Sequence, residues 1–122
     1  MRNSAYSTRN AAQAERQRDE RAAGCMSERF PVVSSIVVTL NYRGGRSSAL
    51  LRTVNFLPGS PAYFRISCLG EGCEGGGLDL TWVIGSMIRR GERTSKGELQ
   101  CMNRDPAILH ADVDYDVAIT YS

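Results

Sequence analysis

The sequence predicts an α+β fold, an antiparallel β-meander on which one helix packs. Three runs in which apolar and polar residues alternate, at residues 34–42, 49–57 and 62–67, are separated by short segments of turn-forming residues. A helical spacing of apolar residues begins at residue 80, and two further strand-like runs follow it. The expected order is therefore β-β-β-α-β-β, with an additional N-terminal helix as an option.

Residues 1–25 are expected to form a charged N-terminal arm, and residues 26–122 a single domain. The arm is rich in Ala, Gln, Glu and Arg, which favour helix, but it has almost no large apolar side chain to dock on a core. We expect it to be disordered or helical, and it could fold on a partner. Met26 is also a candidate for the true start of the chain.

Each expected strand places its apolar side chains on one face, as a half-buried sheet requires. These side chains are Ile36, Val38, Leu40 and Tyr42, then Leu50, Val54 and Phe56, then Phe64 and Ile66, and, in the last strand, Val113, Tyr115, Val117, Ile119 and Tyr121. A short strand at residues 97–102 precedes the last one. Asp114 and Asp116 fall on the opposite, outer face of the last strand.

The helix is predicted by an apolar stripe with a start and a stop signal. Leu80, Val83, Ile84, Met87 and Ile88 recur at the spacing of one helix face. Asp79 precedes the stripe as an N-cap, and Gly91 follows it as a C-terminal stop.

A glycine-rich segment, CLGEGCEGGG at residues 68–77, contains a literal G-x-G-x-x-G at Gly70, Gly72 and Gly75. Glu71 and Glu74 would repel a pyrophosphate, and the helix starts too late to place its amides on one. The surrounding strands also come as hairpins and not as βαβ units. We therefore expect no nucleotide cofactor.

The cysteines suggest a structural zinc site in which Cys68, Cys73, Cys101 and His110 are the ligands. The predicted helix is then inserted between the two zinc-knuckle halves. Cys25 is the alternative fourth ligand. Two other interpretations remain open: the cysteines are small buried apolar residues and His110 lies on the surface, or two of the cysteines form a redox pair.

Residues 66–121 resemble small bacterial zinc-ribbon-type domains. The resemblance rests on the ISC-x4-C segment, the EGGGLDL helix start, the GELQC strand and the closing DYDVAITY strand. In such domains two knuckles are separated by a helix, and the second leads into a closing strand. Where they use a fourth cysteine, this chain has His110. The resemblance implies zinc binding and a binding or scaffolding role.

Candidate partner-binding residues are Trp82, Arg89, Arg43 and Arg46. Trp82 falls off the apolar stripe of the helix and shares a helix face with Arg89, so it could anchor a protein partner or stack on a base. The alternative is that Trp82 packs against a neighbouring loop or strand. Arg43 and Arg46, with Arg52 and Arg65, form a run of basic residues uninterrupted by acids.

Charge and composition narrow the class of function. Residues 1–25 carry five arginines against three acidic residues, whereas residues 26–122 carry ten basic and ten acidic groups. Because the body is neutral overall, the sequence argues against a strongly basic nucleic-acid-binding protein, but it does not exclude a local basic patch. No apolar run approaches a membrane span, and the polar N-terminus lacks a signal sequence, so we expect a cytoplasmic protein.

Catalysis is not expected, because the chain has a single histidine and no recognisable catalytic motif. The expected function is a non-enzymatic zinc-binding interaction module, an accessory or inhibitory subunit that binds a protein partner. The alternative is a small zinc-containing nucleic-acid-binding protein that uses an Arg/Trp face.

Overall fold

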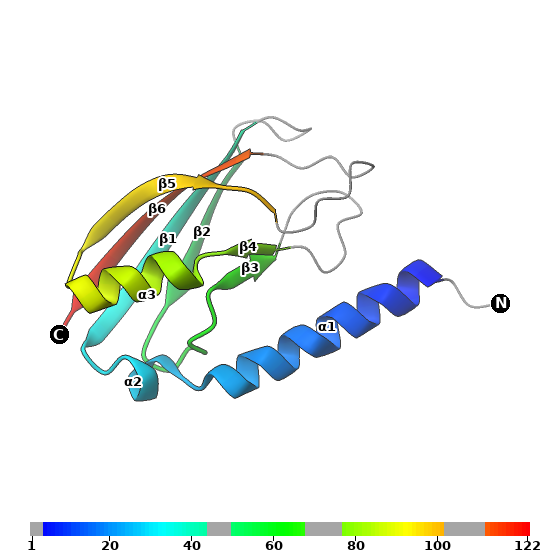
Figure 1. Ribbon diagram of the computed structural model, residues 1–122, viewed down its shortest axis with the longest axis horizontal. Coiled ribbons are helices and arrows are strands. Elements are labelled where there is room, and N and C mark those ends of the chain that lie inside the picture. The colour runs from blue at the N-terminus through cyan, green and yellow to red at the C-terminus, as the bar shows by residue number, and fades with distance from the viewer. Residues whose placement is uncertain (1–3, 44–49, 68–76, 102–111) are drawn as a thin grey trace.

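The computed structural model describes residues 4–43, 50–67, 77–101 and 112–122, and helices and strands within them are labelled in Figure 1. The helices are α1 (Ser4–Ala23), α2 (Met26–Arg29) and α3 (Thr81–Arg90). The strands are β1 (Val33–Arg43), β2 (Leu50–Phe56), β3 (Arg65–Ser67), β4 (Gly77–Asp79), β5 (Thr94–Leu99) and β6 (Asp112–Tyr121). Helices packed with antiparallel strands confirm the predicted α+β class.

Four strands form the main sheet in the order β2-β1-β6-β5, and all three pairings are antiparallel. In the centre of the sheet, Leu40 of β1 lies opposite Arg52 of β2 on one side and Tyr115 of β6 on the other. The first hairpin was therefore predicted correctly. The closing strand lies beside β1, so it is a central strand of the sheet.

The predicted meander is wrong at its third strand. β3 pairs with β4 in a separate two-stranded sheet, and it does not extend the main sheet beside β2. Pro58 and Pro61 interrupt the chain between β2 and β3. Phe64 and Ile66 then bury their side chains in the core cluster that also holds the inner face of the main sheet. The segment therefore lies across the core from the main sheet, where burial of Phe64 and Ile66 stabilises its position.

The core lies between the inner face of the main sheet and a layer made of α3 and the β3–β4 pair (Figure 1). The predicted alternation is observed in β1, where Ile36, Val38 and Leu40 are fully buried while Val37 is exposed. Phe56 and Phe64 meet edge to face, with ring centroids 5.1 Å apart. Burial of each such aliphatic or aromatic side chain contributes roughly 1.5–3 kcal/mol.

The C-terminal end of α3 is formed by Gly91, as predicted, but the N-cap is Leu80, which makes no side-chain cap bond, and not the predicted Asp79 one residue earlier. The Asp79 carboxylate accepts a hydrogen bond of 2.9 Å from the backbone N–H of Thr81. Gly91 adopts a left-handed conformation, with φ of 68°. The N–H groups of Gly91 and Glu92 then bond back to the carbonyls of Ile88 and Met87, at 3.2 and 2.9 Å. This arrangement satisfies carbonyls that the helix end would otherwise leave unpaired.

The N-terminal arm is helical in the structure, which is the second of the two expected forms. α1 runs alongside the β3–β4 side of the molecule, and its N-terminal end points away from the main sheet (Figure 1). Gly24, with φ of 73°, ends the helix. Its carbonyl accepts a hydrogen bond of 2.8 Å from the N–H of Ala62, which ties the arm to the body. Two short elements, α2 and β4, were not predicted.

The outer face of the main sheet carries Asp114 and Asp116, as expected, together with the exposed apolar side chains of Val37 and Leu51. Lys96 of β5 lies 3.7 Å from the Asp116 carboxylate across the strand pair, with both side chains largely exposed. Such an exposed ion pair contributes little to stability, so this face is best understood as solvated surface.

Candidate functional site

One of the four predicted zinc ligands lies in the described part of the chain. Cys101 follows β5, is only 4% exposed and belongs to the core cluster. Cys68, Cys73 and His110 lie outside the described residues, as does the glycine motif at Gly70, Gly72 and Gly75. Within the described residues alone, no three His, Cys, Asp or Glu side chains are grouped to hold a metal ion.

A buried polar group, the Tyr42 hydroxyl, lies at the same end of the sheet as Cys101. Tyr42, Val113 and Leu99 form one row across the inner face of the sheet, and Cys101 follows Leu99 by two residues. The Tyr42 hydroxyl is buried and has no hydrogen-bond partner among the residues described. A buried hydroxyl normally finds a partner, so this end of the core has an unsatisfied donor.

Cys25, the alternative fourth ligand, lies at the junction of α1 and α2. It is half-buried, and its sulfur lies 3.1 Å from the Ser27 hydroxyl. Its backbone forms an isolated antiparallel bridge with Pro61. The bridge to Pro61 holds Cys25 against the segment between β2 and β3.

Trp82 and Arg89 form one exposed stripe on α3. Trp82 is 73% exposed, more than any other large apolar side chain among the described residues. The Arg89 guanidinium folds back over Gly85, where a Cβ atom would lie 3.3 Å from its Nη1. Because Gly85 has no side chain, Arg89 can lie along the helix towards Trp82. The predicted Trp/Arg pair therefore lies on one accessible surface.

The other two predicted partner residues are not part of this stripe. Arg43 is the last residue of β1, where its backbone lies opposite Asp112 at the end of the sheet distant from α3 (Figure 1). Arg46 lies outside the described residues.

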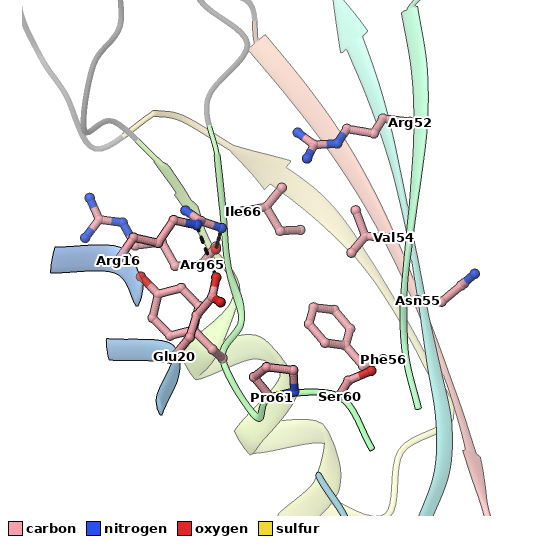
Figure 2. Close-up of a pocket in the computed structure, with 11 residues that line it drawn as sticks. Arg16, Glu20, Arg52, Val54, Asn55, Phe56, Ser60, Pro61, Arg65 and Ile66 are labelled. Carbon is pink, nitrogen blue, oxygen red and sulfur yellow. Dashed lines mark hydrogen bonds and ion pairs between the residues drawn. The ribbon is translucent and has the colours of Figure 1, made fainter. Parts of the chain in front are cut away.

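A groove between α1, β2 and β3 is a site that the sequence did not reveal (Figure 2). Its volume is about 230 Å³. The floor is apolar and contains Val54, Phe56 and Ile66. The rim is charged: Arg16 and Glu20 come from α1, Arg52 from β2 and Arg65 from β3 (Figure 2).

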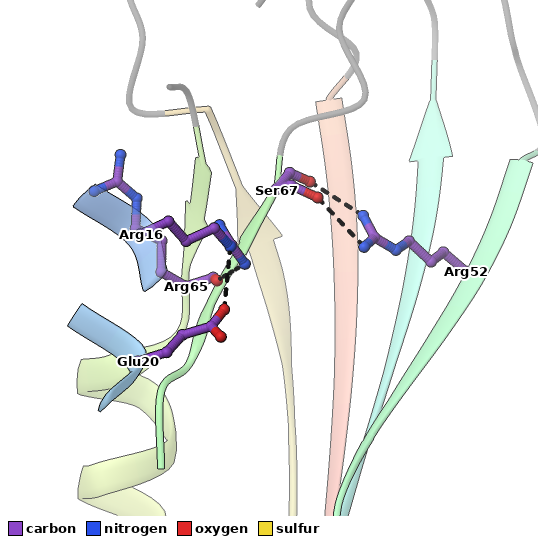
Figure 3. Close-up of polar contacts among 5 residues, drawn as sticks. All are labelled: Arg16, Glu20, Arg52, Arg65 and Ser67. Atoms are coloured by element: carbon purple, nitrogen blue, oxygen red, sulfur yellow. Dashed lines mark hydrogen bonds and ion pairs between the residues drawn. The ribbon is translucent and has the colours of Figure 1, made fainter. Parts of the chain in front are cut away.

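Polar contacts hold the rim in place (Figure 3). Arg16 donates a hydrogen bond of 2.6 Å to the carbonyl of Arg65, and its Nε lies 3.4 Å from the Glu20 carboxylate. The Arg16 guanidinium also lies 5.4 Å from the centroid of the Tyr63 ring. Arg52 donates to the Ser67 carbonyl at 3.1 Å and to the Ser67 hydroxyl at 3.5 Å. Arg52 therefore connects the main sheet to β3.

One signal for this groove is visible in the sequence. Arg52 occupies the apolar row of its strand, in alternation with Val54 and Phe56, where a charged residue is unusual. Arg16, Glu20 and Tyr63 have no such signal, because nothing in the arm indicates which part of the body it contacts.

Comparison of the chain with protein-family models, with curated proteins and with solved structures finds no match. Among the helices of the described segments, none is long and apolar enough to cross a membrane.

Proposed function

We propose that this protein is a non-enzymatic interaction module that binds a protein partner through the exposed stripe of α3. The supporting observation is that Trp82 is 73% exposed on a helix whose opposite face is buried. Exposure of a whole indole to water is unfavourable, and Trp and Arg are the residues most enriched at the energetic centres of interfaces. Arg89 beside Trp82 favours a partner with an acidic surface.

We further propose that a structural zinc ion stabilises the domain, bound by Cys68, Cys73, Cys101 and His110. The burial of Cys101 supports this, because a thiolate in a closed site is shielded from water. The orphaned Tyr42 hydroxyl, at the same end of the sheet, could donate to a ligand sulfur. Zinc bound there would fix the fold and would not activate a substrate.

Metal content tests the zinc proposal directly. Native mass spectrometry of the protein purified without chelator should show one bound zinc ion, and Cys73→Ser should lose it. Thr53→Ala, an exposed position on β2 outside the proposed site, should retain the metal. A folded protein that carries no zinc would refute the site.

Partner binding is tested by comparing co-purified proteins from the source cells for matched variants. Trp82→Ala and Arg89→Glu should lose the same protein that the unmodified chain retains. Leu51→Ala is the control, because Leu51 is also an exposed large apolar residue, at 64%, but lies on β2. The purified partner should then shift the fluorescence of Trp82, the only tryptophan in the chain, to shorter wavelength.

The second candidate is nucleic-acid binding by the same stripe, favoured by the position of Arg89 and Arg90 beside an indole that could stack on a base. A salt titration separates the two functions, because affinity for nucleic acid falls steeply with salt. Arg89→Glu should then abolish binding, whereas Arg43→Glu, at the end of the sheet distant from α3, should not. If no affinity for DNA or RNA is measurable at low salt, this candidate is excluded.

A further inference from the structure

The groove between α1, β2 and β3 combines an apolar floor with a basic rim. Three arginines and one glutamate contribute charged groups to it, so its net charge is positive. The body of the protein is neutral overall, which makes this a local concentration of positive charge. The groove therefore complements a ligand that is acidic and also carries an apolar group.

The guanidinium groups of Arg16 and Arg52 have more hydrogen-bond donors than their described contacts use. A guanidinium has five N–H donors. Arg52 directs two nitrogens at Ser67, and Arg16 directs one at the Arg65 carbonyl and its Nε at Glu20. The remaining donors of Arg16 and Arg52 can bind carboxylates, and their existing contacts hold them in position before any ligand arrives.

The size of the groove indicates how much of a ligand enters it. At about 230 Å³ it is smaller than the roughly 300–1,000 Å³ usual for small-molecule sites. Val54, Phe56 and Ile66 offer a small apolar surface, since Phe56 and Ile66 are only 6% and 4% exposed, so they can contact the tip of one apolar side chain. The rest of the ligand then lies along the rim.

The sheet edge beside the groove favours an extended peptide. In the order of the main sheet β2 is a terminal strand, and among the described strands its one partner is β1. An edge strand presents backbone N–H and C=O groups that an added strand can pair with. Side chains of the added strand that point to the inner side would meet the floor of the groove.

We propose that this groove binds an extended acidic peptide segment of a protein partner, with one apolar side chain on the floor and its carboxylates on Arg16, Arg52 and Arg65. A nucleic acid fits less well, because its sugar–phosphate backbone carries no apolar group that could occupy the floor. The Tyr63 ring, which could stack on a base, is approached by Arg16 instead. None of these residues belongs to the Trp82 stripe or to the proposed zinc site, so this proposal and the proposed function can fail separately.

The test uses the full-length protein and a fluorescein-labelled peptide of about eight residues, in which Glu and Asp surround one central Leu. Binding is followed by fluorescence anisotropy. We expect saturable binding that weakens at least about tenfold in Arg52→Gln/Arg65→Gln, since two charged hydrogen-bond donors are lost. Arg89→Gln/Arg90→Gln removes the same charge from α3 and should change the affinity by less than about twofold.

A peptide with Ser in place of Leu should bind at least about fivefold more weakly, because the floor then holds no apolar group. The proposal is overturned if the Leu and Ser peptides bind equally, if the α3 variant loses as much affinity as the groove variant, or if labelled oligothymidylate binds more tightly than the peptide.

A measurement on the unmodified protein guards against misfolding of the groove variant. Addition of the unlabelled Leu peptide should shift the backbone amide NMR signals of β2, Tyr63 and Ile66, and should leave those of Trp82 and Arg89 in place. Shifts confined to α3, or no shifts at saturating peptide, would contradict the proposal.

Discussion

The two long helices of this protein are held to the body by different physical means. α3 has 10 residues and buries Ile84, Ser86 and Met87, whereas α1 has 20 residues and buries no side chain between residues 14 and 23. Among the described residues, the contacts of α1 with the rest of the chain include the hydrogen bond and ring contact of Arg16, the bond from Arg29 to the Ala23 carbonyl and the backbone tie at Gly24. Apolar burial makes α3 part of the core, while polar contacts make α1 an attached arm. The groove lies where that arm meets the body.

The largest expected effect on stability comes from removing a buried apolar side chain of α3. Ile84→Ala removes a fully buried side chain and should lower the free energy of unfolding by about 2–5 kcal/mol. Trp82→Ala, on the exposed face of the same helix, should change it by no more than about 0.5 kcal/mol. Urea denaturation followed by circular dichroism measures both. A cost below about 1 kcal/mol for Ile84→Ala would contradict the account of α3 as a core helix.

Loss of the polar anchor of α1 should have a smaller and more local effect. Arg16→Ala removes the hydrogen bond to the Arg65 carbonyl and the contact with Tyr63, and should weaken docking by about 1–2 kcal/mol. Cleavage by a Glu-specific protease within α1 should then accelerate about tenfold, with the body intact. Arg18→Ala, an exposed arginine of the same helix, is the control and should not change the rate. If unfolding of the whole domain accompanies cleavage, α1 is more than an arm.

The link between α3 and the closing strand should depend on pH. The Tyr121 hydroxyl donates to the carbonyls of Glu92 and Met87, at 2.7 and 3.2 Å. Burial, followed by the charge of Glu92, raises the pKa of Tyr121 above its usual value of 10.0, while Arg93 opposes the shift. The folded state therefore holds the proton more tightly than the unfolded state. This contribution to stability is complete below pH 10 and is lost as pH rises through the folded pKa.

Tyr121→Phe should cost about 0.5–1.5 kcal/mol at neutral pH and should reduce the loss of stability in alkali. Melting temperatures at about pH 8 and about pH 11 measure the difference. Tyr115→Phe serves as the matched control. If both variants keep the same alkaline slope as the unmodified protein, Tyr121 does not carry the effect.

The smallest expected effect has the opposite sign. Gly85→Ala should stabilise the protein by about 0.5–1 kcal/mol, because alanine favours helix over glycine. The new methyl group would lie 3.3 Å from the mobile end of Arg89, which can move aside. Gly91→Ala is the contrasting control: its positive φ of 68° strains any side chain, so the same change should destabilise. Thermal denaturation distinguishes the two signs.

Much of the fold could be predicted because it depends on local patterns. The alternation in residues 34–42 and 113–121 predicted two central strands, and the stripe from Leu80 to Ile88 predicted α3, with its C-terminal end at Gly91. Less of the candidate site could be predicted from the sequence. Trp82 and Arg89 could be placed on one helix face from their spacing alone, but Arg43 could not be placed relative to them. The zinc ligands stay a prediction.

The sequence by itself determined which residues face the core, because strand and helix periods follow from backbone geometry. Only the tertiary structure decided which elements became neighbours. Alternation of apolar and polar residues shows which side chains of a strand face the core, but not which strand it pairs with. The pairing of β3 with β4 and the central position of β6 therefore could not be predicted from the sequence. The groove likewise forms only when distant parts of the chain pack together. Arg16 and Arg65 are 49 residues apart in the sequence and come into contact only when α1 docks on the body. Contacts between residues so far apart in the sequence depend on the free energy of the whole packed chain, and no local sequence pattern indicates them.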